Sequence, residues 1–165
     1  MLRAEHAGDG STWGREVMNA MIDRAVAKDL EGVLALLGEV KLPIEGVVEH
    51  FDQFHVARED GKIAGCVGQE RYGDAALLRS LAVLPGEQRG GVGQALTARL
   101  LESAQASGVR ELVLLTTTAR DFFARHFGFE VVERNRFDAA FADSSEWHLP
   151  RCSSAVCMHL QLSSE

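Results

Sequence analysis

The sequence predicts a mixed α/β fold whose central sheet is largely antiparallel in its first half. Three observations lead to this prediction. Apolar residues recur at intervals of three and four over residues 30–40 and 92–104, which places them on one face of a helix. Asp60-Gly61 between two apolar segments indicates a hairpin, because glycine tolerates the positive φ of a tight turn. Residues 75–83 are apolar at nearly every position, as in a strand that is buried on both faces.

Each element follows from its own local pattern. The helix over 30–40 must end before Leu42-Pro43, because proline cannot continue it. Gly108 ends the helix that starts near 92, and Gly128 caps a short aromatic helix. In chain order, the expected strands are 19–26, 54–58, 63–68, 75–83, 112–115, 129–132 and 155–162, and the expected helices are 30–40, 47–51, 92–104 and 119–127. This order predicts a single sheet covered by helices.

The length of 165 residues fits one domain with one main core. Residues 1–18 have no hydrophobic period and are rich in glycine and charge. They predict a flexible N-terminal extension before a single domain over 19–165.

Composition and charge exclude several classes of function. Lys and Arg number 17 against 24 Asp and Glu, a net charge of −7, so a basic nucleic-acid surface is not expected. The apolar runs are too short to span a membrane, and residues 1–18 lack the apolar region of a signal peptide. The 3 cysteines form no CxxC pair, which disfavours a disulfide framework or a zinc site. We expect a cytoplasmic protein without metal, nucleic-acid or membrane partners.

Glycines gather between the strand at 75–83 and the next helix, in Gln88-Arg89-Gly90-Gly91-Val92-Gly93. A glycine loop that opens a helix binds anions through unpaired backbone N–H groups and the positive end of the helix dipole. A Walker A loop would need lysine where Val92 stands, and a dinucleotide fingerprint would need glycine where Leu96 stands. The remaining form, [QR]-x-x-G-x-[GA], is complete in Gln88, Gly91 and Gly93.

This form, directly after a strand that ends Leu81-Ala82-Val83, resembles the loop of the GCN5-related N-acetyltransferases (GNATs). Phe122-Phe123 followed by Gly128-Phe129 resembles the family's aromatic ending, and the likeness covers about residues 20–162. It implies the GNAT fold: a mixed, mostly antiparallel sheet of six to seven strands, flanked by about four helices, with a splay between the two central strands. Further segments resemble the arsenic-resistance-associated (ArsN-type) members, and these are LPIEGV at 42–47, GQERYG at 68–73, LLRSLAV at 77–83, LLTTTA at 114–119 and CSSA at 152–155.

The resemblance implies acetyl-CoA as co-substrate. The N–H groups implied to hold its pyrophosphate belong to Gln88, Arg89, Gly90, Gly91, Val92, Gly93 and Gln94. The residues implied to lie along its pantetheine arm and acetyl group are Leu81, Ala82, Val83, Thr117 and Phe123. A backbone N–H near Val83 would polarise the thioester carbonyl, and the amine would attack it directly in a ternary complex.

Direct attack requires a neutral amine, so a base must remove its proton. Glu70, at the end of a central strand, is the leading candidate, and a solvated carboxylate is its alternative interpretation. His55 could act through a water, although a histidine on a strand is more often structural. Proton removal by ordered water alone stays open.

The acid that would protonate the CoA thiolate is missing. The family's usual tyrosine is replaced by Phe123 or Ala124, and Thr116 can donate only a hydrogen bond. Arg79 lies inside an apolar strand, where an unpaired charge is costly. It either binds a substrate anion, beside Glu70, or forms a salt bridge to Glu70 or Asp74.

The leading hypothesis is an N-acetyltransferase for the primary amine of a small amino-acid-like molecule, such as an arsenical or phosphinate toxin. The missing tyrosine favours an alternative, a non-catalytic acetyl-CoA-binding sensor. A protein or peptide N-acetyltransferase is a third hypothesis. The edge of the C-terminal strand suggests pairing into a homodimer.

Overall fold

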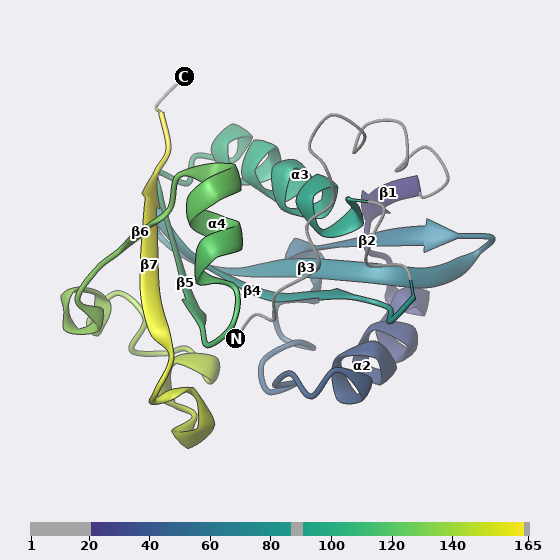
Figure 1. Cartoon of the computed structure of the whole chain (residues 1–165), viewed down its shortest axis with the longest axis horizontal. Coiled ribbons are helices and arrows are strands. Elements are labelled where there is room, and N and C mark those ends of the chain that lie inside the picture. The colour runs from purple at the N-terminus through teal and green to yellow at the C-terminus, as the bar shows by residue number, and fades with distance from the viewer. Residues whose placement is uncertain (1–20, 87–90, 164–165) are drawn as a thin grey trace.

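The computed structural model describes residues 21–86 and 91–163, and they form one sheet of 7 strands in the order β1-β2-β3-β4-β5-β7-β6 (Figure 1). The strands are β1 (Met21–Arg24), β2 (Phe54–Glu59), β3 (Lys62–Tyr72), β4 (Ala75–Val83), β5 (Glu111–Thr116), β6 (Glu130–Val131) and β7 (Val156–Gln161). Neighbours pair antiparallel except β4 and β5, which are parallel. The predicted fold class is therefore confirmed.

Helices cover both faces of the sheet (Figure 1). Those of the described part are α2 (Leu30–Glu39), α3 (Val92–Ala106) and α4 (Arg120–Phe127). The expected helix at 47–51 is wrong, because these residues form turns that lead into a short 3-10 helix, Phe51–Gln53. A segment this short cannot repay the cost of helix nucleation. Within the described ranges, none of the helices combines the length and the apolarity that crossing a membrane requires.

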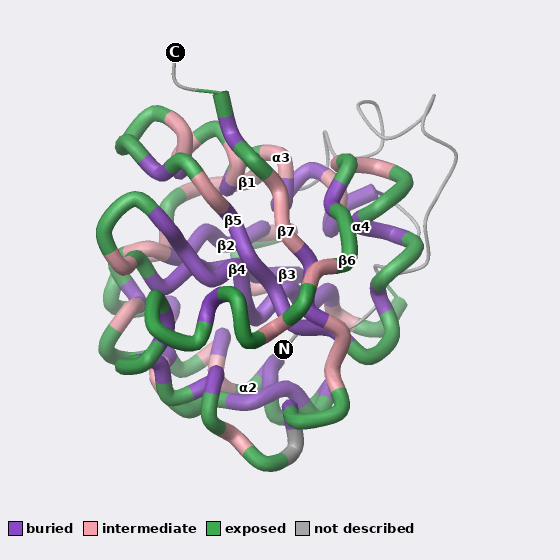
Figure 2. Tube along the Cα trace, turned by 90° about the vertical axis from the view of Figure 1, so that its left-hand side faces the viewer, coloured by how far each residue is buried: buried purple, intermediate pink, exposed green. Residues whose placement is uncertain are grey.

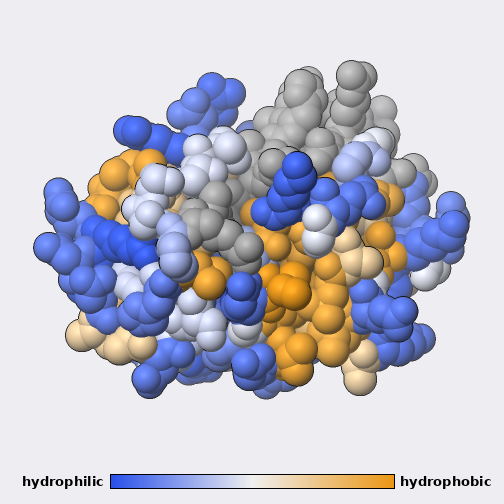
Figure 3. Space-filling view, turned by 90° about the horizontal axis from the view of Figure 1, so that it is seen from below, coloured by the Kyte–Doolittle hydropathy of each residue, from blue (hydrophilic) through white to orange (hydrophobic). Residues whose placement is uncertain are grey.

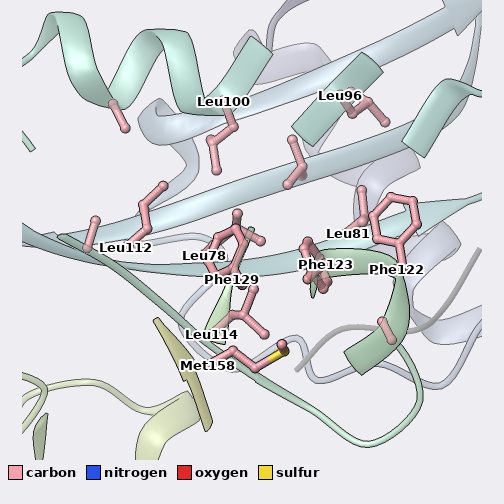
Figure 4. Close-up of a cluster of buried hydrophobic side chains, with 14 of the residues drawn as sticks. Leu78, Leu81, Leu96, Leu100, Leu112, Leu114, Phe122, Phe123, Phe129 and Met158 are labelled. Carbon is pink, nitrogen blue, oxygen red and sulfur yellow. The ribbon is translucent and has the colours of Figure 1, made fainter. Parts of the chain in front are cut away.

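One face of the sheet packs against α3 and α4 through a continuous apolar cluster (Figure 4). Side chains alternate between the two faces along a strand, so Leu78 and Leu112 point into this cluster together with Leu96 and Leu100 of α3. Phe123 of α4 is fully buried in the same cluster. This layer fixes α3 firmly against β3 and β4.

The other face is divided between two apolar clusters. One packs α2 against β2 and β3 and includes Leu37 and Phe54. The other joins β4 and β5 to the segment 137–152 and includes Phe141 and Trp147. The central strands are buried along most of their length (Figure 2), yet polar residues lie between these two clusters.

The two central strands separate as the resemblance implied. β4 pairs with β5 only from Ala75, opposite Glu111, to Leu78, opposite Leu114, although β4 continues to Val83. Figure 1 shows the two strands diverging. On its other side β4 carries an extra residue against β3 near Ser80, which has a left-handed φ of 61°. This bulge coincides with the point where β5 departs.

The C-terminal strand is not an edge, which corrects the basis of the expected dimer contact. β7 lies between β5 and β6, and the sheet ends at β1 and β6. The homodimer itself stays a prediction.

Gly68 provides a test of this packing. A Cβ at this position would lie 2.2 Å from Cε1 of Phe54, a fully buried ring that has no room to move. We expect Gly68→Ala to lower the free energy of unfolding in urea by about 1–3 kcal/mol. The control is Gly38→Ala in α2, where a Cβ meets nothing within 4 Å and alanine favours the helix. Equal stability of the two variants would contradict this packing.

Candidate functional site

The N-terminus of α3 lies close to the splay. Gly91 is its N-cap residue with a left-handed φ of 74°, and the chain reaches it by a short connection from the end of β4. Val92, in the first turn, packs in the same cluster as Leu81 and Val83. Helix geometry leaves the first N–H groups without intrahelical partners, so those of Val92, Gly93 and Gln94 point out of the N-terminal end of the helix. Of the residues expected in this loop, Gln88, Arg89 and Gly90 lie outside the described residues.

β4 offers an extended backbone next to this helix end. Val83 pairs with Gly65 and Ala82 with Cys66, both on β3. From Arg79 onward, β5 no longer runs beside β4. The segment from Leu81 to Val83 is therefore an extended part of β4 beyond its pairing with β5.

A buried polar cluster lies on the opposite face of the sheet from α3. Glu70 on β3 and Arg79 on β4 are both fully buried, and Arg79 Nη1 donates to Glu70 Oε2 at 2.6 Å. Tyr72 donates its hydroxyl to Glu70 Oε1, also at 2.6 Å. Glu146, likewise fully buried, places Oε1 3.7 Å from Arg79 Nε. The ion pair with Glu70 is one of the two alternatives that the sequence left open for Arg79, and Asp74 instead is exposed.

Arg79 also holds the turn that follows α2. Its guanidinium donates to the carbonyl oxygens of Glu45 at 2.6 Å and Pro43 at 3.2 Å, and its Nε donates to Ser80 Oγ at 2.9 Å. Gly46 comes so close that a Cβ there would lie 2.9 Å from Nη1, and its φ is +85°. One side chain thus links the turn, the bulge and the buried carboxylate.

These contacts determine the protonation of the cluster. Burial alone would raise the pKa of Glu70, but the Tyr72 hydrogen bond and the charge and hydrogen bond of Arg79 outweigh it and hold that pKa below its ordinary value. Burial and the Glu70 carboxylate raise the pKa of Tyr72, which therefore stays protonated as a donor. A carboxylate held in this way is a weak base.

His50 is a member of this site that sequence reasoning missed. Its Nε2 lies 3.7 Å from Glu70 Oε1, and its side chain is 26% exposed. The ring contacts Tyr72 edge-on, with the centroids 5.9 Å apart. No spacing signal links a turn at 50 to a strand at 70, so only the folded chain brings them together.

His55 is not part of the cluster, and its role as a base through a water stays a prediction. Phe54 and Val56 on either side of it pack toward α2, so His55 faces α3. It is 3% exposed, and burial with the charges of Arg99 and Arg24 lowers its pKa to about 4. His55 is therefore buried and neutral, on the opposite face of the sheet from Glu70.

Three other expected residues have defined places. Thr116 Oγ1 accepts the N–H of Ala119 at 2.9 Å at the start of α4. Thr117 is exposed next to the end of β5. Phe123 is fully buried between Phe122 and Phe129, so its side chain has no surface for a cofactor, which corrects that expectation.

Ala124, beside Phe123, is exposed. The three cysteines are free and buried, and burial raises the pKa of Cys66 to about 12, as fits core residues rather than nucleophiles.

Comparisons with known proteins agree with the fold. A family model described as an acetyltransferase (GNAT) domain matches residues 50–131. The uncharacterized N-acetyltransferase CT2212 of Chlorobaculum tepidum is 31% identical over 114 residues, which are 68% of this chain and 72% of that protein. The chain belongs to the GNAT acetyltransferase family.

This GNAT is also similar to larger proteins. An amino-acid acetyltransferase of Pseudomonas fluorescens (strain Pf0-1) is 31% identical over 142 residues, which are 81% of this chain and 33% of that protein. The chain thus spans about a third of the length of these curated relatives. N-acetylglutamate synthase from Neisseria gonorrhoeae, complexed with coenzyme A and N-acetyl-glutamate, has a TM-score of 0.74 at 23% identity, and the match covers 87% of this chain and 35% of that one. Rv2747 from Mycobacterium tuberculosis, in complex with CoA, has a TM-score of 0.70 at 25% identity, and the match covers 87% and 99%.

The buried ion pair of Arg79 and Glu70 predicts how single and double variants change the free energy of unfolding. Arg79→Met leaves the Glu70 carboxylate buried without its counter-charge, and we expect the free energy of unfolding at pH 7 to fall by about 3–5 kcal/mol. Adding Glu70→Gln should recover part of this loss, because the uncompensated charge is then gone. The control is Arg71→Met, which removes an exposed side chain of the same strand pair. If Arg79→Met costs no more than Arg71→Met, the pair does not stabilise the fold.

His55 predicts a pH dependence of stability. The unfolded chain binds a proton at this residue below about pH 6.5, whereas the folded chain does so only near its pKa of about 4. Stability should therefore decrease as the pH falls from 6.5 to 4, with a contribution from His55 of about 3 kcal/mol at most. His55→Gln should flatten this part of the curve in urea unfolding, and His148→Gln, at an exposed position, should not. Unchanged curvature in His55→Gln would contradict the buried neutral state.

Proposed function

We propose that this chain transfers the acetyl group of acetyl-CoA to the primary amine of a small amino-acid-like molecule. The observation that carries the proposal is the splay of β4 and β5 beside the N-terminus of α3, in a chain of the GNAT family. The amino-acid acetyltransferases among its relatives, and the coenzyme A complexes among similar structures, support both substrates.

The N-terminus of α3 and the end of β4 bind different parts of acetyl-CoA. The N–H groups of Gly91 to Gln94 receive the pyrophosphate, with Gln88 to Gly90 extending the same loop. The pantetheine arm runs along Leu81 to Val83, past the exposed Thr117. Backbone dipoles carry this binding, so a chain of net charge −7 can hold a polyphosphate without a lysine cluster.

The reaction needs no covalent enzyme intermediate. The ammonium group of the acceptor loses one proton, and the resulting amine attacks the thioester carbon to form the C–N bond. The C–S bond then breaks, the nitrogen loses a second proton, and the CoA thiolate takes up one proton. The balance is one amide, one CoA thiol and one proton released. Thr116 and Thr117 contribute at most hydrogen bonds near the leaving thiolate.

The acceptor lies on the face of Glu70 and Arg79, at the point where β5 leaves β4. Arg79 is fully buried and paired with Glu70, so a substrate anion would have to compete for its guanidinium with Glu70 and with the carbonyl oxygens of Pro43 and Glu45. The same side of the molecule carries an apolar area (Figure 3), and Ile44 and Val48 are exposed in the turns there. A small amino acid with a short apolar part fits these surroundings.

The narrower hypotheses concern the acceptor. The ArsN-type motifs favour an arsinate or phosphinate amino acid, whereas the relatives favour ordinary amino acids. The exposed Ala124 in place of a tyrosine favours the non-catalytic acetyl-CoA sensor. A peptide N-terminus as the acceptor is also a proposal. The cytoplasmic location and the homodimer are proposals too.

The test is a screen of acceptors with acetyl-CoA. Free thiol is measured with a chromogenic disulfide, and the acetylated product is identified by mass. The acceptors are the common amino acids, arsinate and phosphinate amino acids, and peptides with free N-termini. Turnover with a small amino acid is expected. Tight acetyl-CoA binding without turnover on any amine would favour the sensor, and peptide turnover alone would favour the third hypothesis.

Two matched glycine variants test acetyl-CoA binding at the N-terminus of α3. Gly91 and Gly61 have nearly equal left-handed φ values of 74° and 78°, so alanine strains both backbones alike. Because only Gly91 opens α3, we expect Gly91→Ala to weaken acetyl-CoA binding at least tenfold in calorimetry and Gly61→Ala to leave it unchanged. Equal affinities would remove the α3 N-terminus from the binding site.

A further inference from the structure

Glu70 is poorly placed to accept the proton of the acceptor amine. It is fully buried, and its two carboxylate oxygens already receive the Tyr72 hydroxyl and the Arg79 guanidinium. Both contacts stabilise the ionised form, so protonating this group would break a charge-assisted hydrogen bond. A carboxylate in such a position acts on a neighbour rather than on the substrate.

The neighbour is His50. Its Nε2 lies 3.7 Å from Glu70 Oε1, and its ring rests edge-on against Tyr72. With 26% of its side chain exposed, it reaches both the carboxylate and the open side of the cluster. If the neutral ring keeps its hydrogen on Nε2, facing the carboxylate, its Nδ1 lone pair is left to accept a proton.

The turn that carries His50 is held at the splay. His50 N–H donates to the carbonyl of Gly46 at 3.2 Å, and Gly46 lies against Arg79, the first residue of β4 past its pairing with β5. The backbone of the turn that carries His50 is therefore held at the point where β5 leaves β4.

We propose that His50 is the general base of acetyl transfer and that Glu70 is its positioning carboxylate, which rests on the acetyltransferase function proposed above. His50 takes the first proton of the ammonium group, the amine attacks the thioester carbon, and the imidazolium formed is stabilised by the Glu70 anion. His50 then returns its proton to solvent or to the CoA thiolate, and the overall balance is the one given above.

The charges around His50 come from several elements and set its response to pH. The groups of the cluster and its turn are Glu70, Tyr72, Arg79, Glu146, Asp143, Glu45 and Glu49. Glu70 is the charge within ion-pair distance of the imidazole, at 3.7 Å.

The experiment is the pH profile of kcat/KM for the best acceptor of the screen, between pH 5 and 9. The wild type should show a limb of falling activity toward acid pH, because a protonated imidazole cannot accept the proton of the ammonium group. His50→Gln should lower kcat/KM by about 10²–10⁴-fold and remove this limb, and the limb from the acceptor's own amine should remain. Imidazole added to His50→Ala should restore part of the rate. His148→Gln is the control, and acetyl-CoA affinity should be equal in all variants.

Two further variants separate positioning from a merely structural role. Glu70→Gln removes the anion that favours imidazolium, so the limb should move to lower pH while the rate falls. Tyr72→Phe leaves more negative charge on the carboxylate, so the limb should move to higher pH, and this variant serves if Glu70→Gln does not fold. His50→Gln with the wild-type rate and limb would overturn the proposal. A wild type that binds acetyl-CoA but acetylates no amine would overturn the proposed function instead.

Discussion

The ion pair between Arg79 and Glu70 is the interaction on which the rest of this site depends. Both groups are fully buried, and each would be costly without the other. Arg79 then reaches outward to the carbonyls of Pro43 and Glu45, so the turn after α2 is fixed to the sheet through one guanidinium. The buried charge therefore adds hydrogen bonds to a turn that Leu42 and Val47 also hold by apolar packing.

The two faces of the sheet differ in character because of this pair. The face toward α3 and α4 is a single apolar cluster, which suits rigid support of a helix N-terminus. The opposite face is split into two apolar clusters, and the polar residues fill the gap between them. β4 separates from β5 at Arg79, so the buried ion pair lies where the two central strands part.

Much of the fold could be predicted because local sequence patterns indicate most of its helices and strands. The periodicity over 30–40 and the near-continuous apolar run at 75–83 each gave an element within a few residues of its observed bounds. The segment 47–51 failed because a few apolar residues near a proline satisfy a helical spacing without the length that a helix requires. The splay came from the resemblance alone, since nothing in β4 or β5 marks where pairing stops.

The site was harder to predict than the fold. Arg79 stood out because a charge inside an apolar strand demands a partner, and Glu70 stood out because it lies at the end of a central strand. His50 and Glu146 lie in irregular segments, and they join the cluster through contacts across 20 or more positions of sequence, for which no periodicity exists. His55 was the second candidate base after Glu70, and strand alternation places it on the other face of the sheet.

The separation of β4 from β5 has a consequence for the lifetime of this protein in a cell. A sheet that parts between two central strands forgoes the backbone pairing that would otherwise close it, and a ligand arm can supply that pairing instead. A ligand that binds only the folded chain stabilises it by about 2.7 kcal/mol at a free concentration one hundred times its Kd. The lifetime of the folded protein would then follow the supply of its co-substrate, with starved cells clearing it faster than well-fed ones.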